Sequence, residues 1–419
     1  MLIPTIIFLS VYSLIISEKL NRVVAALFGA SLMLLFRFIS QAEAFAKVDF
    51  NTIGLLVSMM IIVNITKRTG IFEYVAIKAT KISKGNPITL LVVFSLITFT
   101  FSALLDNVTT VLLIVPVTLV VTKTLDTNPI PFLMSEILSS NIGGTATLIG
   151  DPPNIMIGSA ANLSFMDFIV NLAPIVVVIF IINIFLIKYI YKKDVHTTEE
   201  KKKIVMNLDE TKTITDKVLL KKCLIVLGFT LLGFLIHGYF GFESATIAII
   251  GSSVLLLISK TDPEEILQEV EWGTLFFFIG LFIMTGVLEK VGLMNILAAK
   301  TLELTKGSLL LSAILVLWIS SIASSFIDNI PFVATMIPLI KAMATAGHMN
   351  VLPLWFALSL GSCLGGNGTI VGASANLIVI GIAEKSGHKI SFKDYFKIGF
   401  PLMLISICIS TVYLLVFYL

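Results

Sequence analysis

Residues 141–154 read Asn-Ile-Gly-Gly-Thr-Ala-Thr-Leu-Ile-Gly-Asp-Pro-Pro-Asn, a polar and glycine-rich string inside an otherwise apolar stretch. Residues 363–376 repeat the pattern as Cys-Leu-Gly-Gly-Asn-Gly-Thr-Ile-Val-Gly-Ala-Ser-Ala-Asn. A continuous helix does not tolerate such strings, because in its interior each glycine costs about 1 kcal/mol and each proline about 3 kcal/mol. We therefore expect two spans whose helices are broken in the middle.

The whole chain has the composition of a membrane protein. Of its 419 residues, 57% are hydrophobic and 13% are charged, and the mean hydropathy is +1.01. Soluble proteins carry about 25% charged residues. The nearly balanced charge of +3 excludes a nucleic-acid binder, whose basic residues would gather on one face. The three cysteines and four histidines are scattered, so we expect no disulfide framework, no metal centre and no cofactor.

Ten apolar runs have the length of about 17–25 residues that a bilayer requires. They cover residues 2–17, 22–40, 51–66, 132–150, 168–190, 222–239, 243–259, 272–289, 353–371 and 395–418. The first run lacks the basic start and the cleavage pattern of a signal peptide, so we expect it to be a span. Two longer stretches with polar centres, 88–122 and 308–340, are expected to form re-entrant hairpins or pairs of short spans.

The second half of the chain repeats the first. A constant shift of 222 positions superimposes Gly70 on Gly292 and Pro116 on Pro338. The same shift pairs the polar centres, namely Ser102 with Ser324, Asp106 with Asp328, Asn107 with Asn329, Gly143 and Gly144 with Gly365 and Gly366, Gly150 with Gly372, Thr147 with Thr369, and Asn154 with Asn376. The chain is therefore a duplication, with repeat 1 over 1–191, a polar linker over 192–221 and repeat 2 over 222–419.

Lysine and arginine are distributed unevenly over the expected loops. If each repeat has five crossings and one re-entrant hairpin, and if 192–221 is cytoplasmic, 23 of the 29 basic residues lie on the cytoplasmic side. This bias follows the positive-inside rule and places the N-terminus outside the cell. Because the number of crossings per repeat is odd, the repeats are inverted, which is typical of secondary transporters. The expected fold class is an all-α polytopic membrane protein with two inverted repeats.

Each expected hairpin carries a carboxylate at its tip, Asp106 in the first and Asp328 in the second. The local interpretation is that each aspartate caps the second helix of its hairpin. A carboxylate far from both membrane surfaces is costly, and such residues are by default functional. We therefore also expect at least one of the two to bind Na⁺ or H⁺.

Unwound backbone at membrane depth is tolerated only where it lines a cavity or is buried in protein. The freed carbonyls and neighbouring polar side chains offer oxygen ligands for Na⁺, although the glycines could instead serve only close helix packing. We expect two pseudo-symmetric sites with the substrate between them. The candidate residues for ion or substrate binding are Ser102, Asp106, Asn107, Thr109, Asn141, Gly143, Gly144, Thr145, Thr147, Gly150, Asp151, Asn154, Ser324, Asp328, Asn329, Gly365, Gly366, Asn367, Thr369 and Asn376. The possible Na⁺ ligands among them are Asp106, Asn107, Asn154, Asp328, Asn329 and Asn376.

The two repeats differ at several of these positions. Asp151 is opposite Ala373 and is a candidate for recognition or proton coupling, or else a simple cap of the helix that follows. Glu136, whose twin is a leucine, is either a proton site or an interfacial residue.

At these motifs the sequence resembles the ion transporter superfamily, in its arsenite permease and melanosomal P-protein branch. In view of this resemblance, Cys363 is either an arsenic ligand or a small buried hydrophobe. The likeness covers nearly the whole chain and rests on Asp106–Thr110, Asp328–Phe332 and above all Gly150–Asn154. The Asp-Asn tips also resemble sodium/proton antiporters of the same superfamily. The resemblance implies ion-binding roles for Ser102, Asp106, Asn107, Asn154, Ser324, Asp328, Asn329 and Asn376.

The resemblance further implies a homodimer with an elevator mechanism. The scaffold would comprise residues 1–70 and 222–292, and the mobile transport domain residues 86–191 and 308–419. An aspartate precedes the asparagine at each hairpin tip, whereas the tips of the sodium/dicarboxylate branch read Ser-Asn-Thr. This difference disfavours dicarboxylate symport. No lysine or arginine lies deep in a hairpin or broken span, so a di- or trianion would meet only helix N-termini.

We expect a secondary transporter of the cell membrane that couples Na⁺ or H⁺ to a neutral solute such as arsenous acid, a monovalent ion or a small monoanion. The alternatives are a Na⁺/H⁺ antiporter, a Na⁺-coupled carboxylate symporter and an anion channel. An intramembrane aspartyl protease with Asp106 and Asp151 as its dyad is the enzyme alternative. The repeat disfavours it, because it pairs Asp106 with Asp328 instead.

Overall fold

The computed structural model describes residues 1–17, 20–207 and 209–419, and in these residues it contains helices and loops but no β-strand. Repeat 1 contains α1 (Leu2–Ser17), α2 (Arg22–Leu35), α3 (Gln41–Lys47), α4 (Phe50–Lys67), α5 (Ile71–Ile82), α6 (Pro87–Leu104), α7 (Asn107–Thr124), α8 (Ile130–Thr145), α9 (Pro152–Ala161), α10 (Phe165–Asn171) and α11 (Ala173–Tyr191). Repeat 2 contains α13 (Lys217–Phe240), α14 (Ser244–Ser259), α15 (Pro263–Gln268), α16 (Trp272–Lys290), α17 (Leu293–Leu304), α18 (Leu309–Phe326), α19 (Asn329–Gly347), α20 (Leu352–Gly365), the 3₁₀ turn η2 (Ile370–Gly372), α21 (Ser374–Lys385) and α22 (Phe392–Phe417). Within the described residues, nine of these helices are long and apolar enough to cross a membrane.

The backbone repeats along with the sequence. Gly70 and Gly292, which precede α5 and α17, have φ angles of +76° and +79°. Gly85 and Gly307, which follow the same two helices, both have φ of +67°. Glycine reaches this left-handed region without steric penalty. The duplication is thus visible in the turns that connect the elements as well as in the elements themselves.

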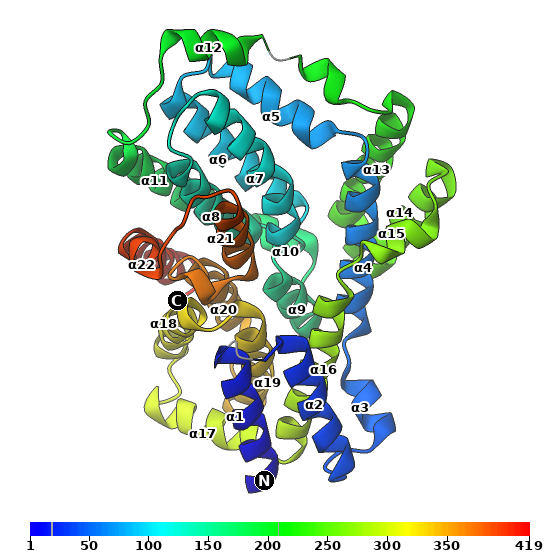
Figure 1. The fold of residues 1–419 in the computed structure, drawn as a ribbon. Coiled ribbons are helices and arrows are strands. Elements are labelled where there is room, and N and C mark those ends of the chain that lie inside the picture. Colours follow the sequence, from blue (N-terminus) through cyan, green and yellow to red (C-terminus); the bar gives the residue numbers. More distant parts are fainter. Residues whose placement is uncertain (18–19, 208) are drawn as a thin grey trace.

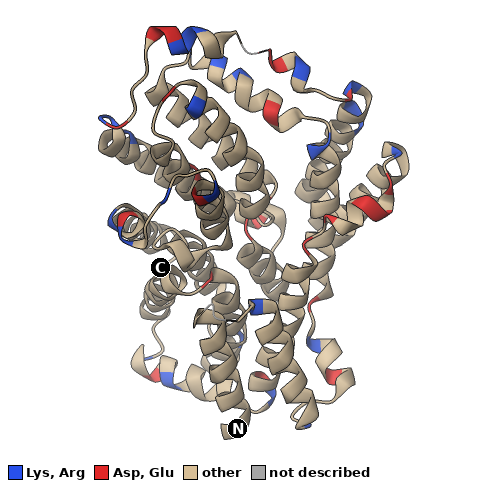
Figure 2. Ribbon diagram, in the orientation of Figure 1, with Lys and Arg blue, Asp and Glu red and all other residues tan. Residues whose placement is uncertain are grey.

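The two repeats are inverted relative to each other, as expected. In Figure 1, α5 lies at the top beside the linker helix α12 (Glu199–Met206), whereas its counterpart α17 lies at the bottom near the N-terminus. Helices of one repeat pack on helices of the other, α2 on α16 and α4 on α14. Charged residues gather toward the two ends of the molecule and are sparse in the middle (Figure 2).

The linker is more structured than the sequence suggests. It contains α12 and the 3₁₀ turn η1 (Glu210–Thr213), and α13 begins at Lys217, ahead of the expected boundary. Lys81 of α5 forms an ion pair with Glu210, which lowers the pKa of Glu210 below its ordinary value. A Cβ at Gly70 would lie 1.8 Å from the Thr213 carbonyl oxygen. Only glycine therefore allows the linker to approach α5 this closely.

Both long apolar stretches form helical hairpins, and both glycine-rich strings break a span. The hairpins are α6 with α7 and α18 with α19. In repeat 1 the helix stops at Thr145 and resumes at Pro152, and in repeat 2 it stops at Gly365 and resumes at Ser374 after a 3₁₀ turn. The expected spans 132–150 and 353–371 are therefore only the first halves, and α9 and α21 continue them.

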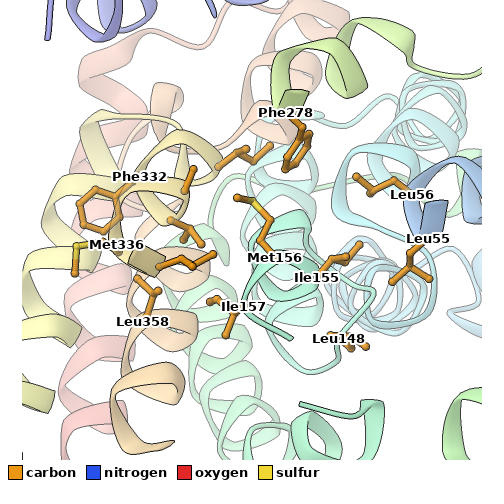
Figure 3. Close-up of a cluster of buried hydrophobic side chains, with 14 of the residues drawn as sticks. Leu55, Leu56, Leu148, Ile155, Met156, Ile157, Phe278, Phe332, Met336 and Leu358 are labelled. Atoms are coloured by element: carbon orange, nitrogen blue, oxygen red, sulfur yellow. The ribbon is translucent and has the colours of Figure 1, made fainter. Parts of the chain in front are cut away.

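Helix α9 lies in apolar surroundings between α4 and α19. Figure 3 shows Ile155 and Met156 of α9 between Leu55 of α4 and Met336 of α19. All four side chains are buried. The contact between the first broken span and α4 is therefore made of hydrocarbon.

Candidate ion and substrate site

Asp106 and Asp328 cap the second helices of their hairpins. An Asp106 carboxylate oxygen accepts a hydrogen bond from the Thr109 backbone N at 2.8 Å. An Asp328 oxygen accepts one from the Ile330 backbone N at 3.1 Å. The local capping interpretation is confirmed, and each carboxylate has a second oxygen left for other partners.

Serine and threonine hydroxyls attach each hairpin to the broken span of its own repeat. Ser102 Oγ donates to the Ser140 carbonyl at 2.6 Å, and Ser324 Oγ donates to the Ser362 carbonyl at 2.6 Å. Thr147 Oγ1 donates to the Ala103 carbonyl at 2.5 Å, and Thr369 Oγ1 donates likewise to the Ser325 carbonyl. These four hydroxyls therefore fix the hairpin tips against the breaks in the same way in both repeats.

Besides breaking the spans, the glycines allow the backbone of each broken span to pack closely on neighbouring backbone. Gly143 is still helical, and a Cβ there would lie 2.2 Å from the Phe99 carbonyl oxygen of α6. At Gly365 the corresponding distance to the Ser321 carbonyl oxygen of α18 is 2.6 Å. Gly144 and Gly150 approach each other across the first break, where a Cβ on Gly144 would lie 2.5 Å from the Gly150 carbonyl oxygen.

The side-chain amides of Asn154 and Asn376 satisfy the carbonyls that the breaks set free. Asn154 Nδ2 donates to the carbonyls of Gly144 at 3.3 Å, Thr145 at 3.2 Å and Thr147 at 2.9 Å. Asn376 Nδ2 donates to the Gly366 carbonyl at 2.7 Å and to the Thr369 carbonyl at 2.9 Å. With their nitrogens engaged, both asparagines present Oδ1 to residues outside their own break.

A cluster of four asparagines links the first hairpin tip to the broken span of repeat 2 through Asn141 of repeat 1. Asn107 Nδ2 donates to Asn141 Oδ1 at 3.3 Å. Asn141 Nδ2 donates to Asn367 Oδ1 and to Asn376 Oδ1, both at 2.9 Å. All four side chains are buried. Thr145 Oγ1 supports the cluster by donating to the Asn141 carbonyl at 2.7 Å.

The second hairpin tip meets the broken span of repeat 1 in a different cluster. Asn329 Nδ2 donates to the two carboxylate oxygens of Asp151, at 3.3 and 3.2 Å. Although Asp151 precedes α9, its side chain makes no capping hydrogen bond, so the simple capping interpretation is wrong. Asn154 Oδ1 accepts from Ser359 Oγ at 2.6 Å and from Cys363 Sγ at 3.4 Å.

The two other candidates, Glu136 and Cys363, are both buried in the protein. Glu136 of α8 is fully buried within the protein. One of its oxygens accepts a hydrogen bond from Thr118 Oγ1 at 2.5 Å, and the other has no hydrogen-bond partner among the described residues. Cys363 is a buried free thiol whose hydrogen bond goes to Asn154. Among the described residues, no group of three His, Cys, Asp or Glu side chains is placed to hold a metal ion.

Arg22, at the start of α2, is a residue of this site that no sequence pattern predicted. Its Nη1 donates to Asp328 Oδ2 at 2.9 Å and to Ser374 Oγ at 2.6 Å. Both hairpin tips lack basic residues in sequence, but the structure brings this arginine to one of them from another helix. No local signal marks it, because 306 residues separate Arg22 from Asp328.

A cavity of about 290 Å³ lies beside the second hairpin tip. Its polar lining residues are Asn21, Arg22, Asp328 and Ser374, and the remaining lining is aliphatic. The cavity separates α1 and α2 from the hairpin tip and the start of α21. An ion or small solute in it would contact both a carboxylate and a guanidinium.

Comparison with known proteins places this architecture among transporters. A family model described as "Citrate transporter" matches residues 12–361. A 46 kDa membrane protein of Mycobacterium leprae is 42% identical, over 99% of this chain and 98% of its own length. An uncharacterized transporter of Mycobacterium tuberculosis is 42% identical, over 97% of this chain and 96% of its own length.

Two further matches extend the likeness. The human P protein is 34% identical over 99% of this chain, which spans 59% of that protein's length. The crystal structure of the Alcanivorax borkumensis YdaH transporter superimposes with a TM-score of 0.58, covering 92% of this chain and 88% of that one. At 14% sequence identity, the YdaH likeness concerns the fold.

Proposed function

The chain belongs to the citrate-transporter family of membrane transporters, and we propose that it is a secondary active transporter that couples Na⁺ or H⁺ to a small solute. The observation that carries the proposal is the pair of buried polar clusters that link each hairpin tip to the broken span of the other repeat, directly at Asn329 and through Asn141 at Asn107. Burying so many amides and carboxylates costs free energy unless they are hydrogen bonded, paired with an opposite charge or bound to a ligand. An exchangeable cation would be such a ligand.

The oxygen atoms in these clusters suit a small hard cation. Asp151 contributes both of its oxygens at one cluster, and Asp106 keeps one uncapped oxygen at the tip of the first hairpin. We assign the coupling cation to these carboxylates, to the carboxylate of Asp328 and to the Oδ1 atoms of the cluster asparagines. Of the three aspartates in this region, Asp328 is the one already balanced by an arginine.

The charge balance of the site favours a neutral solute or a small monoanion as substrate. Three aspartates face a single arginine, so a trianion such as citrate would need several cations to accompany it. A carboxylate symporter is the second candidate, because the matching family is described by citrate and Arg22 offers a carboxylate one bidentate partner. Na⁺/H⁺ antiport without a further solute is the third.

We further propose that the transporter is a homodimer of the cell membrane and works by an elevator motion. In this motion the hairpins and broken spans (86–191 and 308–419) move together against the scaffold (1–70 and 222–292). The apolar contact of α9 with α4 supports this division, because hydrocarbon surfaces slide without breaking hydrogen bonds. The hydroxyl contacts of Ser102 and Ser324 within the moving part support it as well.

The test is solute flux in proteoliposomes under imposed Na⁺ and pH gradients, with arsenite and citrate as separate test solutes. We expect one gradient to drive uptake or exchange and Asp106→Asn to abolish the gradient dependence. Asp216→Asn is the matched control, because Asp216 also caps a helix, α13, but lies in the exposed linker. Flux that neither gradient changes would contradict the proposal, and non-saturating ion flux would indicate a channel.

A further inference from the structure

Arg22 and Ser374 hold the same oxygen of Asp328. Besides the Arg22 contact at 2.9 Å, Asp328 Oδ2 accepts a hydrogen bond from Ser374 Oγ at 2.7 Å. Arg22 also donates to Ser374 Oγ at 2.6 Å, which closes a three-membered network. The network joins α2 to both the second hairpin tip and the start of α21. It therefore links the proposed scaffold to the proposed moving part.

The aspartate of the other repeat has no such partner. Within the described part of the chain, no lysine or arginine lies within ion-pair distance of Asp106. The twin position of Arg22 is Ser244 and that of Ser374 is Pro152, so neither partner is duplicated. The duplication thus preserved both tip carboxylates but provides a cation for only one of them.

Arg22 is placed so that it can leave Asp328. Its side chain is 33% exposed, whereas that of Asp328 is 12% exposed. The guanidinium faces the 290 Å³ cavity and lies 5.3 Å from the centroid of the Phe277 ring. A cation–π contact of this kind stabilises a guanidinium that has lost its carboxylate.

We propose that Arg22 is an internal cation that competes with the coupling cation for Asp328. In the empty transporter the guanidinium neutralises the carboxylate and ties the second hairpin to α2. A Na⁺ ion or proton that binds Asp328 displaces Arg22 into the cavity and releases the hairpin tip. The inference rests on the proposed function, and it adds a reason why the empty second hairpin stays in place.

Other ionisable groups surround this network and would share in its response to pH. Tyr12 of α1 and Asp151 at the first break interact electrostatically with Asp328. Glu271, which precedes α16, interacts with Arg22 and with Asp106. Sodium titrations at constant pH therefore isolate the competition better than pH titrations do.

The experiment measures the half-saturating Na⁺ concentration at fixed pH, or the half-saturating proton concentration if H⁺ is the coupling ion. Arg22→Gln removes the competitor and should lower this concentration roughly 1.5- to fivefold, the range expected when a partly exposed ion pair is lost. Arg22→Lys should restore a value close to wild type. Ser374→Ala should shift it in the same direction as Arg22→Gln but less.

Arg68→Gln is the matched control, because Arg68 also bridges the two repeats through carboxylates, Glu265 and Glu269, both at 2.8 Å. It should leave the half-saturating concentration unchanged. Cation-dependent thermal stabilisation of the detergent-solubilised protein gives the same comparison without any substrate. Both readouts use the full-length chain.

An unchanged or higher half-saturating concentration in Arg22→Gln, with cation dependence intact in wild type, overturns the competition and leaves the proposed function standing. A wild-type protein without any cation dependence overturns both. If Arg22→Gln does not fold, Arg22→Lys and Ser374→Ala still decide the question. The competition predicts a wild-type half-saturating concentration for Arg22→Lys and a slightly lower one for Ser374→Ala.

Discussion

Single asparagines connect the two repeats at the centre of the molecule. Asn141 contacts Asn107 in its own repeat and Asn367 and Asn376 in the other. In repeat 2 the equivalent position is Cys363, whose thiol contacts Asn154 Oδ1 at 3.4 Å and Ser362 Oγ at 4.0 Å. The two repeats therefore differ at a position where they touch each other.

Replacing Asn141 with leucine should destabilise the protein and abolish cation coupling. The substitution removes one donor and one acceptor and leaves three buried asparagines partly unpaired, at roughly 1–3 kcal/mol for each unsatisfied group. The measurement is the thermal unfolding midpoint in detergent together with cation-driven flux. Asn183→Leu is the control, since Asn183 is also buried and hydrogen bonded but lies in α11.

The control variant should lose stability without losing cation dependence. If Asn141→Leu folded with a wild-type unfolding midpoint, the four-asparagine cluster would be of little energetic importance. If it transported with wild-type cation dependence, the cluster would not belong to the ion site. The two readouts separate the structural role of Asn141 from its proposed role in binding.

At the level of elements, each hairpin and the first half of its broken span form one packed unit. Helices α6 and α8 pack closely, as do α18 and α20. The close approach depends on glycines that meet backbone carbonyls, Gly143 at Phe99 and Gly365 at Ser321. The hydroxyl of Ser102 then joins α6 to the α8 backbone at 2.6 Å.

Gly143→Ala should therefore destabilise the protein. A Cβ at this position would lie 2.2 Å from a backbone oxygen, which cannot rotate away as a side chain can. Overpacking of this kind typically costs about 1–3 kcal/mol, and a backbone contact belongs at the upper end. The measurement is the unfolding midpoint in detergent.

Gly228→Ala in α13 is the matched control, because nothing lies within 4 Å of a Cβ there. Alanine should be neutral or slightly stabilising at that position, since it favours helix over glycine by about 1 kcal/mol. Equal midpoints for the two variants would argue against the packing role of Gly143. A lower midpoint for Gly143→Ala alone would support it.

Elements were predictable from the sequence where the backbone itself is constrained. Glycine and proline marked both broken spans, and the repeat located the hairpins and their capping aspartates. The partners across repeats were not predictable. Asp151 suits a helix cap in sequence, but its side chain turns to Asn329 of the other repeat. Arg22 starts the apolar run 22–40 in the sequence, whereas in space it lies at the second hairpin tip.

At the scale of the whole molecule, inversion explains why two copies of one sequence make a single site. The second hairpin tip contacts the broken span of repeat 1 directly, through Asn329 and Asp151. The first hairpin tip is linked to the broken span of repeat 2 through Asn141 of its own repeat, which bonds both Asn107 and Asn376. Neither repeat completes a cluster alone. A transport cycle that shifts one hairpin therefore alters contacts in both repeats.

Inversion also predicts which residues can be reached from each side of the membrane. The linker lies at one end of the molecule beside α5, and α17 lies at the other end (Figure 1). The excess of basic residues predicts that the linker end faces the cytoplasm. A cysteine at Lys201 in α12 should therefore react with a membrane-impermeant thiol reagent only after cells are permeabilised. A cysteine at Lys300 in α17 should react in intact cells.

The labelling uses a background in which the exposed Cys408 is replaced by serine, because the other two cysteines are buried. Lys78→Cys in α5 is the decisive third variant, since α5 and α17 are repeat-related helices of the same length. Like Lys201→Cys, it should not react with the reagent in intact cells, although α5 occupies the same position in repeat 1 as α17 does in repeat 2. Labelling of α5 and α17 from the same side would contradict the inversion. Labelling of all three positions with the sides exchanged would retain the inversion and reverse the assigned orientation.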